Sequence, residues 1–521
     1  MASTSRRTFL QSVGSGMLVA GLGAGLVQDL GFSTAFANEG PETLKFGKYD
    51  SLVDLMQSTP PDKLQALLIE KLNCGEADLK QLTVAAALAN AETFGGEDYV
   101  GFHTAMAMLP AWGMVNALPA DRQPLPVLKV IYRNSDQIQK YGGADKKTLR
   151  ERIAAEEATV ENAGSVNTGL AIRDACRVAD VEKGEQLFAA FENAPLEDAF
   201  NVLQPVMQDD INVHRFVFAH RTYGLANMLG TDHAYTILRQ CVRFCCSHEK
   251  NRIERKGQES PIRTVLPKLM DQYKLAGKKL GKRDPGDAAV EELANAIYNG
   301  PPEKSAEAVA AALAEGMDVE VVGEAISLAS NLLVLRQGPD VWRAHGDSAG
   351  VHSSDATNAF RNMARHGDPQ FAKSGLIVAA YHSAAHNAFK GEMYPTTEHR
   401  SMIKMTDPEG LLAEAEDAVR HNDQGRAAAA IALYGEGGGS PEAVYERMLK
   451  YTISEDGRLH GEKYFQTVQE EYKTTRPALR WRQIVGLARV TASAYGYDRQ
   501  DKHGSRAPGY EDACKLLKIE V

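Results

Sequence analysis

Four histidines at matching places in a repeated pattern are the residues of this chain best suited to chemistry. They are His103, His214, His352 and His460. Neutral imidazole is a common transition-metal ligand and the usual acid or base near neutral pH. If the four side chains converge, they can hold iron, copper or zinc, or line a pocket for an organic ligand. The alternative is structural, because a histidine at the start of a helix can hydrogen-bond a neighbouring carbonyl or turn and act as a cap.

A second candidate is a pair of histidines that follows the third repeated one. His382 and His386 lie four residues apart beside Tyr381 in an apolar segment. Side chains at this spacing share one face of a helix, so both rings can chelate one ion. The segment is not HExxH, so it lacks the glutamate of the zinc proteases. The sequence therefore offers six histidines as metal ligands, while such a pair also arises in helices that bind nothing.

A third cluster combines thiols with an imidazole. Cys241, Cys245 and Cys246 precede His248, and thiolates with an imidazole suit copper or zinc. Cysteines in a helix more often serve as small apolar core residues. The six cysteines of the chain contain no CxxC and no CxxCH motif, so neither a CxxC zinc or redox site nor covalent haem is expected.

Each repeated histidine is preceded by two segments with the apolar periodicity of helices. In order along the chain these segments are Leu64–Leu72 with Leu79–Ala91, Leu187–Phe191 with Leu196–Met207, Val309–Leu313 with Val319–Val334, and Ala427–Leu433 with Ser440–Tyr451. Twenty-five residues after each histidine comes a further apolar helical segment, around Leu128, Arg239, Ile377 and Val485. The pattern predicts four helical repeats.

The repeats pair into a larger duplication, because the first and third histidines are 249 residues apart and the second and fourth 246. We therefore predict an all-α fold of two similar halves, residues 38–250 and 288–500, joined by a linker at 251–287 and followed by a tail at 501–521. Helical repeats with one apolar face must stack on one another to bury it. Equivalent positions then approach the symmetry axis, which makes the four histidines candidates for one shared site or two related ones.

The first 37 residues have the features of a twin-arginine secretion signal. Arg6 and Arg7 stand before a glycine-rich apolar stretch, Val13–Val27, and Ala35-Phe36-Ala37 forms an A-x-A cleavage site before Asn38. An ordinary secretion signal or an uncleaved anchor is the alternative. The apolar stretch is shorter than the roughly 20 residues that span a bilayer, so the mature chain is expected in the periplasm or another extracytoplasmic space without a membrane span.

Composition excludes several classes of protein. The chain carries a net charge of −10 and has no clustered basic face, so it is a poor partner for nucleic acid. The basic run Lys278–Arg283 is expected to be a solvated surface segment, although it could bind an acidic partner. The sequence contains no P-loop, no Rossmann glycine pattern, no GxSxG elbow and no EF-hand loop.

Two of the histidine segments resemble a known family. Gly101–Ala107 and Gly350–Ala356 both read His-x-x-x-Ala after a glycine, and this is similar to the helix starts of the questin oxidase-like helical family. The resemblance implies an all-helical fold and an oxygenase-like activity, and it carries over to His103 and His352. No Rieske CxH and CxxH pair is present, so an iron–sulfur role does not follow.

Two hypotheses for the function emerge. The first is an exported oxidoreductase, or a metal- or ligand-binding protein, with a site built from the repeated histidines and a small-molecule ligand. The second is a non-catalytic helical scaffold that binds a protein partner. The distances between the four histidine rings separate them, because converging rings favour a site and scattered rings favour caps.

Overall fold

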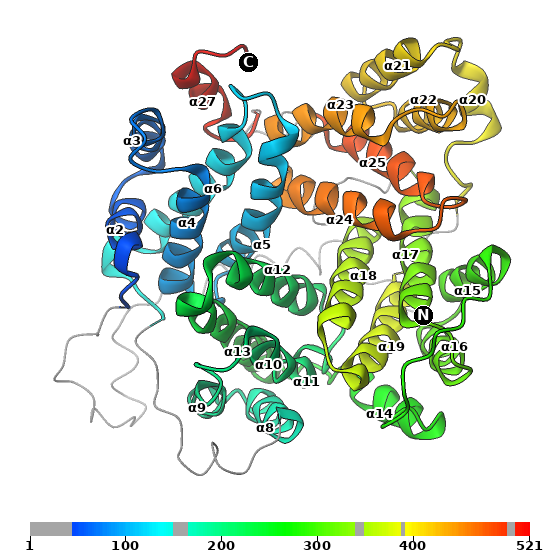
Figure 1. Cartoon of the computed structure of the whole chain (residues 1–521), viewed down its shortest axis with the longest axis horizontal. Coiled ribbons are helices and arrows are strands. Elements are labelled where there is room, and N and C mark those ends of the chain that lie inside the picture. Colours follow the sequence, from blue (N-terminus) through cyan, green and yellow to red (C-terminus); the bar gives the residue numbers. More distant parts are fainter. Residues whose placement is uncertain (1–43, 150–164, 339–347, 387–390, 497–505) are drawn as a thin grey trace. The chain divides into compact units, whose positions relative to one another are not determined.

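Helices predominate in the computed structural model, which describes residues 44–149, 165–338, 348–386, 391–496 and 506–521 (Figure 1). The prediction of an all-α fold is confirmed. Within these residues no strand forms, and the only β-type contacts are two isolated bridges, between Gly281 and Asp318 and between Arg283 and Met317. The predicted secretion signal at residues 1–37 lies outside the described residues.

The helices of the described residues have the following bounds. In chain order they are η3 (Gly47–Tyr49), α2 (Asp50–Ser58), α3 (Pro61–Asn73), α4 (Leu79–Phe94), α5 (Tyr99–Met114), η4 (Val115–Ala117), α6 (Pro124–Tyr141), η5 (Gly143–Asp145), α8 (Ser165–Arg177), α9 (Val181–Ala189), α10 (Leu196–Asn201), α11 (Gln204–Met207), α12 (Val213–Leu229), α13 (Thr231–Glu254), α14 (Ile262–Gln272), α15 (Asp287–Asn299), α16 (Pro302–Ala314), α17 (Val319–Arg336), α18 (Ala349–His366), α19 (Pro369–Ala385), α20 (Thr397–Met402), α21 (Pro408–Arg420), α22 (Gln424–Glu436), α23 (Pro441–Ser454), η7 (Gly457–Leu459), α24 (His460–Thr474), α25 (Trp481–Ala494) and α27 (Tyr510–Leu517).

Polar caps set the start of three of the four helices that carry a repeated histidine. The side chains of Asp98, Asn212 and Ser348 accept hydrogen bonds from backbone N–H groups in the first turns of α5, α12 and α18. Such caps satisfy donors that the helix itself leaves unpaired. The fourth helix, α24, begins differently, because Leu459 before it is left-handed with φ 61° and provides no side-chain cap. Each start places its histidine within the first turns of the helix.

One predicted helix is broken in the structure. The segment expected to be continuous from Leu196 to Met207 forms two short helices, α10 and α11. Pro205 is the reason, because its ring removes a backbone donor and clashes with the carbonyl four residues earlier, here Asn201. Apolar periodicity does not register this loss, since Pro205 continues the apolar pattern.

The four histidine-bearing helices form a closed ring of contacts (Figure 1). Helix α5 packs against α12, α12 against α18, α18 against α24, and α24 against α5. Each of these helices also packs against the helix that follows it, α6, α13, α19 or α25. The helices predicted around Leu128, Arg239, Ile377 and Val485 are these four outer ones. The ring brings together segments that are up to about 360 residues apart in the sequence.

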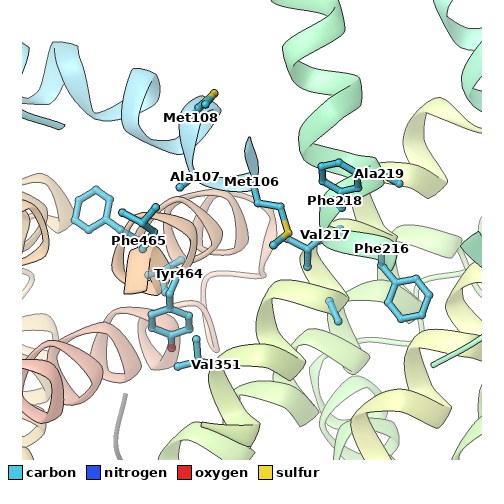
Figure 2. Packing of buried hydrophobic residues seen from close by; sticks show 14 of the residues in the cluster. Met106, Ala107, Met108, Phe216, Val217, Phe218, Ala219, Val351, Tyr464 and Phe465 are labelled. Carbon is cyan, nitrogen blue, oxygen red and sulfur yellow. The ribbon is translucent and has the colours of Figure 1, made fainter. Parts of the chain in front are cut away.

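Apolar side chains from all four ring helices fill the space between them (Figure 2). Met106, Val217, Val351 and Tyr464 come from α5, α12, α18 and α24, and each is at most 3 % exposed. Burying side chains of this size stabilises a fold by about 1.5–3 kcal/mol each, so these side chains help to hold the four helices of the ring together.

The segments predicted as linker and tail contain packed helices. Helix α14 lies within residues 251–287 and packs against α16 and α19, with Ile262 and Leu269 buried. Helix α27 lies within residues 501–521 and packs against α3 and α6. The division into two similar halves remains a prediction. None of the helices in the described ranges combines the length and the apolar character required to cross a membrane.

A buried ion pair ties the outer helix α6 to the ring. Lys129 on α6 contacts Glu462 on α24, and the two side chains are 1 % and 0 % exposed. The Lys129 ammonium also donates to the backbone carbonyls of Thr452 and Glu455. Glu462 stands two residues after His460, so this pair anchors the start of α24.

We expect Lys129→Met to destabilise the protein by about 3–5 kcal/mol, because it leaves the Glu462 carboxylate buried without its cation. Urea unfolding followed by circular dichroism measures the change. The double variant Lys129→Met/Glu462→Leu should recover a large part of the loss, since it removes the unpaired charge. An equal loss in the double variant would show that packing, and not the charge, is responsible.

Candidate metal centre

The structure brings the four repeated histidines together at the centre of the helix ring. The Nε2 atoms of His103 and His214 are 3.2 Å apart, and those of His352 and His460 are also 3.2 Å apart. Between the two pairs, the ring centroids of His103 and His460 are separated by 5.7 Å and those of His214 and His352 by 6.2 Å. The histidines therefore follow the order of the helices around the ring, with two close contacts and two longer ones.

Local hydrogen bonds determine which nitrogen of each ring faces its neighbours. The Nδ1 atoms of His103, His352 and His460 lie 2.6, 3.1 and 3.2 Å from the backbone carbonyls of residues 99, 348 and 457. That of His214 lies 3.2 Å from the Asn212 side-chain oxygen. Because the partner of each Nδ1 atom is an oxygen that accepts a hydrogen bond, the ring proton lies on Nδ1 and the Nε2 atom keeps its lone pair. The same second-shell arrangement orients histidines that bind metals.

The four histidines have features of both interpretations of the sequence. Their Nδ1 atoms bind groups of their own first turns, as the capping hypothesis predicts. Their Nε2 atoms point toward one another across the helix ring, as the site hypothesis predicts. A cap needs only the first contact, and the convergence of four Nε2 atoms is what capping leaves unexplained.

Burial differs within each pair. His103 and His460 are 5 % and 2 % exposed, whereas His214 and His352 are half-buried. Each close pair therefore joins one enclosed ring to one that solvent can reach. The half-buried members of the two pairs belong to the neighbouring helices α12 and α18, so solvent can reach the histidines from that side of the ring.

All four imidazoles are held in the neutral state. Burial is the largest cause that lowers the pKa of His103, His214 and His460 well below the usual value, and it lowers the pKa of His352 to about 3. The ammonium of Lys463 and the neighbouring imidazoles lower these pKa values further. Helix starts add a positive potential that also opposes an imidazolium. Neutral imidazole is the form that binds a metal.

Beneath the histidines lies a floor made of the residue three positions after each one, on the same helix face. These residues are Met106, Val217, Asp355 and Lys463, all at most 3 % exposed. Burial raises the pKa of Asp355 to about 6 and lowers the pKa of Lys463 to about 8. The sequence analysis missed the two charged members, although the spacing of three from His352 and His460 would have found them.

The two histidine pairs lie farther apart than they would if all four rings bound one ion. In the described chain, only Asp210, His248 and Glu249 place three ligand atoms within 4.8 Å of one another. Any three of the four histidines therefore include two ligand atoms that lie more than 4.8 Å apart. An ion about 2.1 Å from each nitrogen needs neighbours about 3.0 Å and opposite nitrogens about 4.2 Å apart in a square, or about 3.4 Å throughout in a tetrahedron. The two histidine pairs would have to move a shorter distance toward each other to form the square than to form the tetrahedron.

Aromatic side chains cover the histidine pair of α5 and α12. The Tyr99 ring lies 4.4 Å from that of His103, and the Phe102 ring stacks on His103 at 4.8 Å. Phe102 also meets Phe244 of α13 edge to face at 5.1 Å. These rings replace water around the imidazoles, which fixes their orientation and maintains the low polarity that keeps them neutral.

The second predicted pair lies beside this centre on α19. His382 is 1 % exposed, and its ring centroid is 4.5 Å from that of the half-buried His386. Its Nδ1 atom is 2.8 Å from the Ile211 carbonyl, in the segment that leads to His214. The pair perturbs the pKa values of the quartet, because His382 lowers that of His214 and His386 lowers that of His352.

The trio Asp210, His248 and Glu249 has metal-like spacing but different chemistry. Glu249 accepts from Arg215 at 2.6 Å and from Arg252 at 2.7 Å, and Arg263 contacts it as well. These guanidinium groups already neutralise the carboxylate, and they would repel a metal cation at the same place. The trio is an ion-pair network that joins α12, α13 and α14.

Two thiols of the third predicted cluster, those of Cys241 and Cys245, have raised pKa values. Burial raises the pKa of Cys241 to about 12 and raises the pKa of Cys245 further. His248 instead contacts the side chains of Asn212 and Arg215. Because a thiol must ionise to bind copper or zinc, these cysteines act as core residues in this fold.

No known protein family, curated protein or solved structure matches this chain. The assignment of the centre therefore depends on its own geometry.

The low pKa values make the stability of the metal-free protein depend on pH. In the unfolded chain His352 titrates near 6.5, whereas in the folded chain its pKa is about 3. Between these values the unfolded chain binds the extra proton, so stability falls as the pH falls from about 6.5 toward 3. We expect His352→Gln to reduce this slope by up to about 1.4 kcal/mol per pH unit.

Chemical denaturation at several pH values in the presence of a chelator measures the slope. His421→Gln is the matched control, because the His421 side chain is 66 % exposed and lies outside the cluster. Equal slopes for His352→Gln and the unmodified protein would contradict the assigned protonation state.

Proposed function

We propose that the protein is an exported metalloprotein whose four-histidine centre binds a redox-active transition metal, iron or copper, for oxidoreductase chemistry on a small molecule. One observation carries the proposal: four histidines from four different helices lie together, with their Nε2 atoms 3.2 Å apart within each of two neighbouring pairs. A folding role for the histidines requires only their local Nδ1 contacts. Convergence of uncharged donors is the arrangement that a metal ion stabilises.

The electrostatics of the site support binding of an ion to preformed ligands. Neutral imidazoles do not repel a cation, and no proton has to leave them near neutral pH because their pKa values are lowered. The Lys463 ammonium opposes a nearby cation, while the Asp355 carboxylate partly compensates for it. Anchoring each Nδ1 to a carbonyl or amide oxygen restricts the ring rotation that binding would otherwise have to stop.

The arrangement of the rings favours iron or copper over zinc. Two close pairs separated by longer distances approach a square more readily than a tetrahedron, and square or tetragonal nitrogen sites suit copper(II), while zinc prefers a tetrahedron. Iron or copper in such a site supplies one-electron chemistry. The likeness of the His103 and His352 segments to the questin oxidase-like family supports an oxygenase-like reaction.

Metal content of the mature chain, residues 38–521, tests this proposal. The protein is prepared without chelator, and separately as metal-free protein loaded with iron(II) or copper(II), and metal is measured by elemental mass spectrometry. We expect about one ion per chain to depend on the quartet, and His103→Ala/His352→Ala to lose at least nine-tenths of it. The loaded protein should show a paramagnetic signal that a reductant and air change reversibly.

The control for this experiment is His421→Ala, which removes an exposed imidazole and should leave the metal content unchanged. Circular dichroism establishes that the double variant is folded. A folded variant that binds as many ions per chain as the unmodified protein, or an unmodified protein that binds none, overturns the proposed function and favours the scaffold hypothesis.

Export by the twin-arginine route is a separate part of the proposal, supported by Arg6, Arg7 and the A-x-A site. We expect Arg6→Lys/Arg7→Lys to retain the precursor in the cytoplasm, whereas the unmodified protein is cleaved before Asn38. Cell fractionation with mass spectrometry of the amino terminus measures both. Continued export of the double-lysine variant contradicts this route and points to the ordinary secretion pathway.

A further inference from the structure

His382 and His386 share with the quartet the feature that prepares an imidazole for metal binding. The His382 Nδ1 atom is 2.8 Å from the Ile211 carbonyl, and the His386 Nδ1 atom is 2.8 Å from the His382 carbonyl. Both contacts place the proton on Nδ1 and leave the lone pair on Nε2. The two rings lie four residues apart on α19 with centroids 4.5 Å apart, so their lone pairs can reach one ion.

The Nε2 atom of His382 is buried and has no hydrogen-bond partner among the residues that the structure describes. The side chain is 1 % exposed, and the edge of the Phe216 ring lies against it at a centroid distance of 5.9 Å. A buried polar atom without a partner is unfavourable, and such atoms in a native protein usually have a partner in the functional state. Apolar packing and the Ile211 carbonyl hold the ring, so its Nε2 atom cannot turn to another acceptor or donor.

The surroundings of this pair suit a cation better than those of the quartet. Among the described residues, the charged states that influence the pKa of His382 are those of His386 and His352, and none belongs to a lysine or arginine. By contrast, Lys463 influences all four members of the quartet. His386 is half-buried, so solvent can reach the pair from its side.

We infer that His382 and His386 hold a transition-metal ion of their own, beside the ion of the quartet, so that the protein carries two metal ions. Both donors are neutral Nε2 atoms, which suits copper or iron, and water completes the coordination. The inference of a two-ion centre rests on the proposed function for the first ion, whereas the pair itself binds independently. The Ile211 carbonyl connects the sites, because it orients His382 at the start of the segment that carries His214.

Stoichiometric titration of metal-free protein with copper(II) tests the inference. Elemental mass spectrometry after removal of free metal should give two ions per chain for the unmodified protein. His382→Gln/His386→Gln should retain one ion, and His103→Ala/His352→Ala should retain the other. Glutamine keeps the volume and polarity of the side chain, and a thermal unfolding curve establishes that each variant is folded. His421→Gln is the control and should retain two ions.

The outcomes distinguish this inference from the proposed function. One ion in the unmodified protein that persists in His382→Gln/His386→Gln overturns the inference and leaves the quartet as the metal site. One ion that is lost in that variant but persists in His103→Ala/His352→Ala supports the pair as a site and overturns the proposed function. No bound ion overturns both.

Discussion

The structure depends on holding four neutral imidazoles together at the centre of a ring of helices. Removing an imidazole from water opposes its protonation, and four of them together add mutual repulsion between the charged forms. The fold meets this requirement by placing each histidine in the first turns of its helix, where the helix dipole also disfavours a positive charge. As a consequence, the imidazoles stay unprotonated and the lone pairs of their Nε2 atoms are available for binding.

Each histidine has two functions that reinforce each other. Its Nδ1 atom takes part in the first turn of its own helix, and its Nε2 atom faces another helix. A change in one helix start therefore moves the atom that faces the centre. This coupling explains why the start of α24 differs: left-handed residues before His460 give its ring a position that a simple capped start would not provide.

The four histidine-bearing helices carry different side chains at the centre, so the surroundings of the histidines are not symmetric. Met106 and Val217 provide an apolar floor under one pair, while Asp355 and Lys463 provide charge under the other. The half-buried rings of α12 and α18 lie toward the side of the His382 pair. The four helices thus carry different side chains around the histidines.

The sequence alone determined the helices, the fourfold placement of the histidines and the companion pair on α19, because apolar periodicity and spacing are local properties. It did not reveal the break at Pro205, since proline continues an apolar pattern, nor the raised pKa values of the Cys241 and Cys245 thiols, which depend on burial. Only the tertiary structure decided that the four Nε2 atoms converge and that Lys463 lies among them. Convergence requires contacts between helices hundreds of residues apart, and such contacts are determined by packing, not by local sequence.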